Sequence, residues 1–306
     1  MPPASTGYWI TPSPSCRTCA GRYCTPTMAA AFHTRFIRAG GFRTRLIEAG
    51  EPGRPAVVLV HDGAYGTDAA LCWDGVIDQL APDYHVIAPD LIGWGGTDKV
   101  CYFDRSPYDY RLEHLAAICG VLGLDDPVFF AGSSFGAEIV ARGTAESRWG
   151  WNVRAAVAIA GTGGRLYRVP GGIERLSDYS PSLDAAARLT AMLVSSADGM
   201  DDHFQRRFDN SMIPGHWESL SALHVRNPAA GPRTGTDDWP EPLRHCPTPI
   251  LWVEGANDPL LEQGWAARMA ELGDSFSSTV VPGGHEPNLE HPAEVGRLIR
   301  DYFARH

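Results

Sequence analysis

The sequence predicts an α/β protein with a mostly parallel, doubly wound sheet and a helical segment inserted into it. Short β-branched apolar runs recur along the chain, and segments of helical period separate most of them. Runs such as "PAVVLVH" are apolar throughout, which is typical of strands covered on both faces. Strand alternating with helix favours a parallel sheet with helices on its two sides. One long stretch, residues 162–242, breaks this alternation.

An antiparallel hairpin opens the pattern, because "FHTRFIRAGG" and "FRTRLIEAG" alternate polar and apolar residues across a glycine pair. Six further strands are expected at "PAVVLVH", "YHVIAPD", "PVFFAG", "RAAVAIAG", "TPILWVEG" and "SSTVVPGG". Apolar residues at helical spacing lie at 112–122, 139–141 and 265–272. The strands and helices therefore alternate along most of the chain.

The insertion and the amino-terminal end have different compositions. Residues 1–27 are rich in Pro, Ser and Thr and lack the continuous apolar region of a secretory signal, so we expect a disordered tail. Residues 162–242 hold no convincing strand but contain amphipathic pieces, and they are too long for a plain loop. We therefore predict a core made of residues 28–161 and 243–306, with a helical lid at 162–242 between them.

Charge and composition exclude several classes of partner. The 306 residues carry a formal net charge of −10 and no run of Lys and Arg, which argues against binding to nucleic acid or an anionic membrane. No apolar stretch reaches the roughly 20 residues that span a bilayer. Cys16, Cys19 and Cys24 lack the further ligands of a metal site, and the dispersed cysteines elsewhere indicate a reduced, cytoplasmic protein. A small-molecule partner is expected, while a homo-oligomer stays open.

A G-x-S-x-G motif indicates the nucleophile. Gly132, Ser134 and Gly136 follow the strand "PVFFA" and precede the helical segment "AEIVARGTAE". A serine in such a turn is lifted onto a strained elbow at the helix amino terminus, where backbone amides suit a developing oxyanion. Ser134 is thus the predicted nucleophile and Ser133 its neighbour.

The partners of this serine are predicted further along the chain. Asp258 follows "PILWVEG" and His285 follows "SSTVVPGG", so both are expected beyond the carboxyl ends of strands, at the edge that carries Ser134. His285 would act as base and Asp258 would orient its ring. A backbone amide of Gly63 or Ala64 and the amide of Phe135 would form the oxyanion hole.

These residues carry a resemblance to the α/β-hydrolase family, and within it to the meta-cleavage product hydrolases of aromatic degradation. It runs from about residue 33 to the end and includes "LVHDGAYGTDAALCWDGVIDQLAPDYHVIAPDLIGWGGTDK" and the insertion segments "YSPSLDAAARLTAMLV" and "FQRRFDNSMIPGHWESL". The resemblance implies the α/β-hydrolase fold with a lid. It also implies cleavage of a carbon-carbon bond in a 2-hydroxy-6-oxo-hexa-2,4-dienoate, with no metal or organic cofactor.

The resemblance also implies substrate-binding residues. Arg207 falls where the group has the arginine that binds the substrate carboxylate. Ser133 and Glu286 stand where the group has asparagine and tryptophan, at positions that line its substrate site. At this stage we expect Glu286 to add a negative charge that repels an anionic substrate.

The residues also allow two other functions. A carboxylic ester or lactone hydrolase would use the same parts without Arg207. A receptor or scaffold that kept the fold and lost turnover is disfavoured by the intact Ser134, Asp258 and His285, since the site rather than the fold decides function.

Overall fold

The computed structural model describes residues 32–103, 105–222 and 237–306, so the predicted tail at 1–27 lies outside the described residues. An eight-stranded sheet has the order β1-β2-β4-β3-β5-β6-β7-β8. Its strands are β1 (His33–Ala39), β2 (Phe42–Ala49), β3 (Ala56–Val60), β4 (His85–Pro89), β5 (Val128–Ser133), β6 (Val153–Ile159), β7 (Ile250–Gly255) and β8 (Phe276–Val281). The predicted hairpin is β1–β2, which joins the sheet antiparallel to β4, and all pairs from β4 to β8 are parallel.

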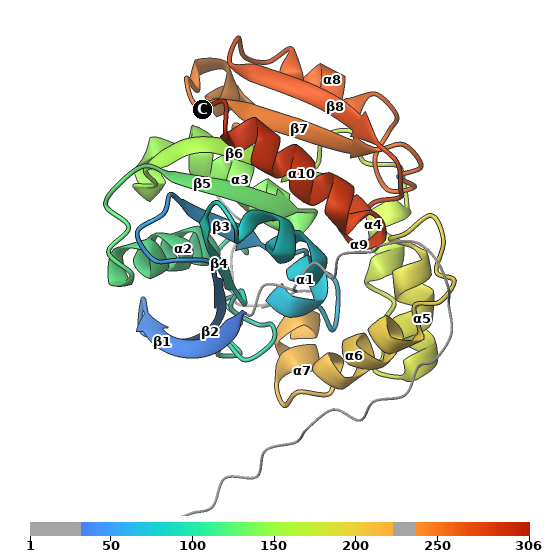
Figure 1. The fold of residues 1–306 in the computed structure, drawn as a ribbon. Coiled ribbons are helices and arrows are strands. Elements are labelled where there is room, and N and C mark those ends of the chain that lie inside the picture. The colour runs from blue at the N-terminus through green and yellow to red at the C-terminus, as the bar shows by residue number, and fades with distance from the viewer. Residues whose placement is uncertain (1–31, 104, 223–236) are drawn as a thin grey trace, which may run out of the picture.

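Helices cover both faces of this sheet (Figure 1). One face packs against α2 (Asp109–Val121), α3 (Phe135–Ala145) and α8 (Trp265–Ala270), and the other against α1 (Ala69–Leu80) and α10 (Pro292–Phe303). Alternate residues of β3 take part in the two cores: Val58 and Val60 pack on one side, Val57 and Leu59 on the other. This two-sided burial explains the continuous apolar runs in the sequence. The short α9 (Pro287–Glu290) precedes α10.

The segment between β6 and β7 contains helices and leaves the sheet (Figure 1). It holds α4 (Gly172–Leu176), α5 (Leu183–Ala191), α6 (Asp201–Ser211) and α7 (His216–Ser221), and the 3₁₀ turn η3 (Glu241–His245) precedes β7. Apolar side chains of this segment, among them Leu189, Leu193 and Leu220, are buried in the core that also contains α2 and α3. Their packing places the segment beside the carboxyl ends of the strands.

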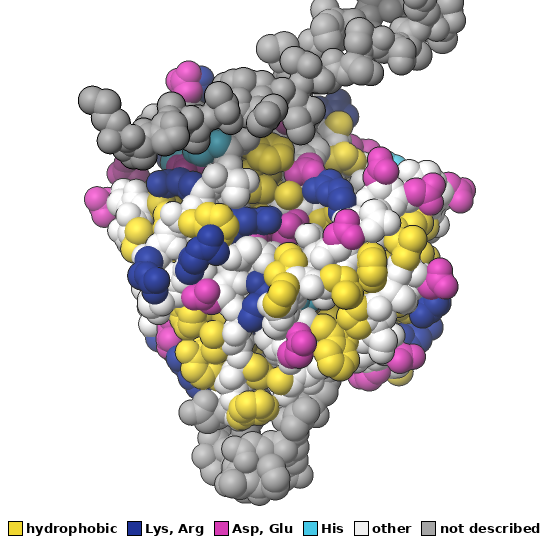
Figure 2. Space-filling view, turned by 90° about the horizontal axis from the view of Figure 1, so that it is seen from below, with side chains coloured by type: hydrophobic (Ala, Val, Ile, Leu, Met, Phe, Trp, Pro, Cys, Tyr) yellow, Lys and Arg dark blue, Asp and Glu magenta, His cyan; other side chains and the backbone are white. Residues whose placement is uncertain are grey.

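Figure 2 shows one face of the molecule, on which basic and acidic side chains both lie among apolar ones. Charges of both signs therefore share this face. No helix among the described residues combines the length and the apolar character that a membrane span needs.

Candidate active site

The turn between β5 and α3 holds Ser134 in a strained conformation. Its backbone has φ 51° and ψ −117°, a combination that non-glycine residues rarely adopt. A side chain at Gly136 would place a Cβ 2.1 Å from the carbonyl oxygen of Val60, so only glycine allows α3 to approach β3 this closely. The strain costs about 1–3 kcal/mol and raises the serine hydroxyl above the edge of the sheet.

Three side chains from distant parts of the chain form a hydrogen-bonded series at this edge. Nε2 of His285 lies 2.8 Å from Oγ of Ser134, and Nδ1 lies 3.0 and 2.9 Å from the two carboxylate oxygens of Asp258. The His285 and Asp258 side chains are only 1% and 2% exposed. With Nδ1 as donor to the carboxylate, Nε2 is the acceptor that faces the serine hydroxyl. The structure therefore brings together the three residues predicted from the sequence.

The loop after β3 lies against the serine turn. A Cβ at Gly63 would lie 2.7 Å from Cβ of Phe135, so the two backbones are close neighbours. The amide of Ala64 donates to Oδ1 of Asp62 at 2.8 Å, while Oδ2 of Asp62 accepts from the Thr67 hydroxyl. The N–H group of Ala64 is therefore already hydrogen-bonded within its own loop. Of the two expected oxyanion donors, Gly63 is the better candidate.

The side chain of Ser133 is hydrogen-bonded to Asn288 and does not line the cavity that contains Ser134. Its buried hydroxyl donates to Oδ1 of Asn288 at 3.0 Å, and Nδ2 of Asn288 donates to the carbonyl oxygen of Cys72. These bonds connect β5, α9 and α1 beneath the catalytic loops. The expectation that Ser133 lines the substrate site has no support in this arrangement, because the residue points toward Asn288.

Arg207 of α6 is fully buried. Its Nη1 donates to the carbonyl oxygen of Tyr65 at 3.0 Å, and its Nη2 lies 3.3 Å from Nε2 of His203. A side chain at Gly66 would clash with the Arg207 carbonyl at 2.0 Å, so α6 lies directly against the loop after β3. The resemblance implied that Arg207 binds a carboxylate. In the structure its Nη1 connects α6 to this loop and its Nη2 contacts His203, while its buried Nε has no hydrogen-bond partner among the described residues.

Glu286 follows His285 and is fully buried, with neither carboxyl oxygen within hydrogen-bonding geometry of another described residue. Burial, followed by the nearby charge of Asp62, holds the pKa of Glu286 well above its usual range. Asp62, unlike Glu286, accepts an N–H and an O–H donor, from Ala64 and Thr67. The raised pKa favours the neutral form of Glu286, which weakens the repulsion expected from a charged carboxylate at this position.

A cavity of about 320 Å³ opens at Ser134. Its wall contains apolar side chains from the core and from the insertion together with a few polar groups: Trp94, Phe135, Ile173, Leu176, Leu193, Leu220, Tyr108, Arg111, Glu138, Arg168, Ser177 and Glu286. A largely apolar cavity with few polar groups is the usual form of a small-molecule site. Arg207 and Ser133 are not part of this wall, whereas Arg111 is.

Arg111 is not among the site residues predicted above, although the sequence contains a signal for it. Arg111 stands on the same helical stripe as Leu115 and Ile118, at i, i+4 and i+7, and all three are buried in α2. An arginine on an apolar stripe, in the first turn of a helix where the dipole disfavours a cation, is unusual. This position on the stripe predicts a buried positive charge.

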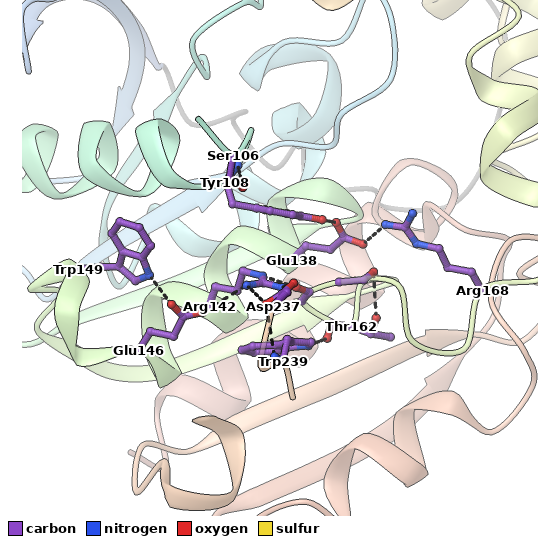
Figure 3. A network of polar contacts seen from close by, with 12 residues as sticks. Ser106, Tyr108, Glu138, Arg142, Glu146, Trp149, Thr162, Arg168, Asp237 and Trp239 are labelled. Atoms are coloured by element: carbon purple, nitrogen blue, oxygen red, sulfur yellow. Dashed lines mark hydrogen bonds and ion pairs between the residues drawn. The ribbon is translucent and has the colours of Figure 1, made fainter. Parts of the chain in front are cut away.

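Three other polar side chains of the cavity wall, Tyr108, Glu138 and Arg168, pair with one another. Figure 3 shows Glu138 between Tyr108 and Arg168. Nη2 of Arg168 lies 2.8 Å from Oε1 of Glu138, and the Tyr108 hydroxyl donates to Oε2 of the same carboxylate. The charge of Arg168 is thus neutralised within the protein.

A comparison with known protein families assigns this chain to one of them. The model of the α/β hydrolase family matches residues 57–298, which include the serine turn, the insertion and the histidine loop. The chain belongs to the α/β hydrolase family. As in other α/β hydrolases, chemistry is expected at the carboxyl edge of the sheet, where Ser134, Asp258 and His285 meet.

Among α/β hydrolases, this chain is similar to enzymes of meta-cleavage pathways. It is 27% identical over 287 residues to a protein of Metapseudomonas resinovorans named 2-hydroxy-6-oxo-6-(2'-aminophenyl)hexa-2,4-dienoic acid hydrolase, covering 90% of this chain and 92% of the relative. A variant of the meta-cleavage product hydrolase from Pseudomonas fluorescens IP01 superposes with a TM-score of 0.75 at 25% identity, covering 89% and 97% of the two chains. A carboxylesterase from Bacillus subtilis reaches 0.74 at 17% identity, covering 92% and 94%, and this likeness concerns the fold alone.

Proposed function

We propose that this protein is a serine hydrolase that cleaves a carbon-carbon bond in a 2-hydroxy-6-oxo-hexa-2,4-dienoate-type compound. The observation that carries the proposal is the hydrogen-bonded series Ser134, His285 and Asp258, whose serine end opens into a mostly apolar cavity. The name of the 27% identical relative supports the substrate class.

In the proposed mechanism, Nε2 of His285 takes the proton of the Ser134 hydroxyl, and Asp258 holds the ring and stabilises the imidazolium that forms. The amides of Gly63 and Phe135 stabilise the negative charge on the attacked carbonyl oxygen. The close approach of Gly63 to Phe135 supports this pairing of donors.

The carbon-carbon cleavage would proceed through the keto form of the substrate. Moving the proton of the 2-hydroxyl group to C5 gives a ketone, and attack of Ser134 on the C6 carbonyl then allows the C5–C6 bond to break. The electron pair of this bond passes through the conjugated C3=C4 bond to the C2 oxygen and forms an enolate, which takes the proton that His285 removed from Ser134. Water releases the acyl group from Ser134 as a carboxylic acid. The substrate's own conjugation accepts the electrons, so the reaction needs no metal or organic cofactor.

The segment at 162–242 would act as a lid over this chemistry. Leu193, which follows α5, and Leu220 of α7 supply apolar surface to the cavity wall. The carbonyl oxygen of Leu193 accepts the amide of Glu286 at 2.9 Å, so the segment also contacts the loop that carries His285. Closing a site in this way excludes water from the reacting groups.

A carboxylic ester or lactone hydrolase is the second candidate. It is favoured by the position of Arg207, which lies outside the cavity wall and donates to Tyr65 instead of facing the substrate space. An ester hydrolase would need the serine, the histidine and the oxyanion donors without this arginine.

Offering the purified protein a panel of 2-hydroxy-6-oxo-dienoates and neutral aryl esters separates the two candidates. Loss of the dienoate absorbance in the wild type, and its absence in Ser134→Ala, is the result that we expect. Turnover of esters with no turnover of any dienoate would reject the carbon-carbon reaction and favour the esterase.

A further inference from the structure

Arg111 is a buried cation on the wall of the cavity that contains Ser134. It lies in the first turn of α2, and because α2 runs back between parallel strands, this turn lies at the carboxyl edge of the sheet. Nε and Nη2 donate to the carbonyl oxygen of Ile92 at 3.1 and 3.0 Å, and Nη1 donates to that of Pro107 at 2.7 Å. A guanidinium has five N–H donors, so each Nη atom has one beyond these bonds. The side chain of Tyr110 also lies against the guanidinium, with its ring centre 4.5 Å from the guanidinium carbon.

The charge of Arg111 has no counter-ion among the described residues. Their ion pairs include Arg168 with Glu138, but none that involves Arg111. Its guanidinium carbon lies 4.8 Å from the ring centre of Trp94 and 5.4 Å from that of Phe135, the residue after Ser134. Carbonyl dipoles and aromatic faces reduce the cost of burying a cation but leave its charge in place.

The remaining carboxyl group on the wall does not cancel this charge. Neither carboxyl oxygen of Glu286 forms a hydrogen bond or ion pair with Arg111. Burial and the neighbouring Asp62 also hold the pKa of Glu286 well above its usual range, which favours its neutral form. Burial lowers the pKa of Arg111 only to about 10, which keeps the guanidinium charged. The described wall of the cavity thus has one uncompensated positive charge, which suits a monoanionic ligand.

We propose that Arg111 binds the carboxylate of an anionic substrate in this cavity, the role that the family resemblance implied for Arg207. The inference rests on the proposed function for the identity of the substrate, and it requires only that the ligand be a carboxylate. Two N–H groups on neighbouring Nη atoms match the two oxygens of a carboxylate. Charged hydrogen bonds in a buried site give about a ten- to hundredfold preference for the acid over a neutral isostere.

Binding to Ser134→Ala protein tests this without turnover. The probes are sorbate, a six-carbon diene acid, and its neutral amide, compared by calorimetry. We expect sorbate to bind about ten- to hundredfold more tightly than sorbamide, and we expect Arg111→Met in the same background to abolish the difference. Arg175→Met, which removes an exposed arginine of α4, is the control for the change in net charge and should preserve it. An unchanged preference in Arg111→Met, or no preference in the parent, would overturn the proposal.

A second variant separates ligand binding from support of the fold. Arg111→Met loses three hydrogen bonds to Ile92 and Pro107, so its folding is checked by circular dichroism and thermal unfolding. Arg111→Lys keeps the charge but not the planar fork, and it should weaken sorbate binding several-fold without affecting sorbamide. Equal losses for both probes would show a purely structural arginine. Loss of the preference in Arg207→Met instead would return the role to that residue.

The same experiments distinguish failure of this inference from failure of the proposed function. If wild-type protein cleaves no dienoate but Arg111→Met still removes the preference for sorbate, the reaction is wrong and the carboxylate site stands. If dienoates are cleaved and the preference survives in Arg111→Met, the reaction stands and the site is wrong.

Discussion

Oγ of Ser134 lies 2.8 Å from Nε2 of His285, although 151 residues separate them in the chain. We therefore expect Ser134→Ala to lose roughly 10³-fold or more of kcat, because members of such a series act as a unit. Steady-state kinetics on any substrate that the wild type turns over provides the measurement.

Ser133→Ala is the matched control for this change. It should keep most of the activity but lose about 1–3 kcal/mol of unfolding free energy, because Oδ1 of Asn288 would remain buried without its donor. Urea unfolding measures the loss. An inactive Ser133→Ala together with an active Ser134→Ala would mean that the nucleophile has been misassigned.

Glu286 should make the folded protein less stable as the pH rises. Its folded pKa lies above the ordinary value of 4.5, so its neutral form is the one that the folded protein favours. The contribution of this group to stability is complete below pH 4.5 and is lost as the pH rises through the folded pKa. Glu286→Gln, which mimics the neutral form, should therefore gain in stability over the wild type as the pH increases.

Urea unfolding from about pH 5 to 9 measures this difference. Glu271→Gln removes an exposed carboxyl group of the same type and serves as the control. A difference between Glu286→Gln and wild type that stays constant over this range would contradict a neutral Glu286.

His216 should make the folded protein less stable as the pH falls. Its Nε2 accepts the Gly66 amide at 2.9 Å and its Nδ1 donates to the Gly93 carbonyl at 3.0 Å, which holds α7 to two loops of the core. Burial, and then the charge of Lys99, lowers the pKa of His216 to about 4. A protonated Nε2 could not accept the amide, so this stability is present above the unfolded pKa of about 6.5 and is lost as the pH falls toward 4.

His216→Gln should be less stable than the wild type at neutral pH, and this difference should shrink by up to about 3 kcal/mol toward pH 4. Denaturant titrations at a series of pH values follow the effect. His245→Gln replaces an exposed histidine and controls for the loss of a titrating ring. Parallel pH profiles for wild type and His216→Gln would argue against this tether.

The proposed lid should open more readily than the sheet. Backbone amides of α4 to α7 are expected to exchange with deuterium faster than those of β3 around Val58 and β7 around Trp252, because the short helices contribute fewer buried residues than the central strands. Bound sorbate should slow exchange in the helices more than in the strands. Equal protection in helices and strands, unchanged by ligand, would contradict a gating role.

Local patterns were sufficient for the sheet and for the serine turn. The alternating pattern correctly predicted the hairpin strands β1 and β2, and the further short runs predicted the six strands β3 to β8. Central strands such as β3 are apolar throughout because they are covered on both faces. The glycines around Ser134 predicted the elbow, because the turn allows no side chain at Gly136. Asp258 and His285 could be selected because residues that follow parallel strands must meet at one edge.

The polar wall of the cavity depended on the tertiary structure. Arg207 and Arg111 are both arginines in helical segments, and only the packing shows that one braces Tyr65 while the other borders the cavity. Glu286 is a charged residue type in the sequence, yet burial beside Asp62, more than 200 positions earlier in the chain, raises its pKa well above the usual range. Strand and turn patterns depend on neighbours in the chain and were predictable from it. Hydrogen-bond partners and desolvation depend on neighbours in space, so only the folded chain could decide them.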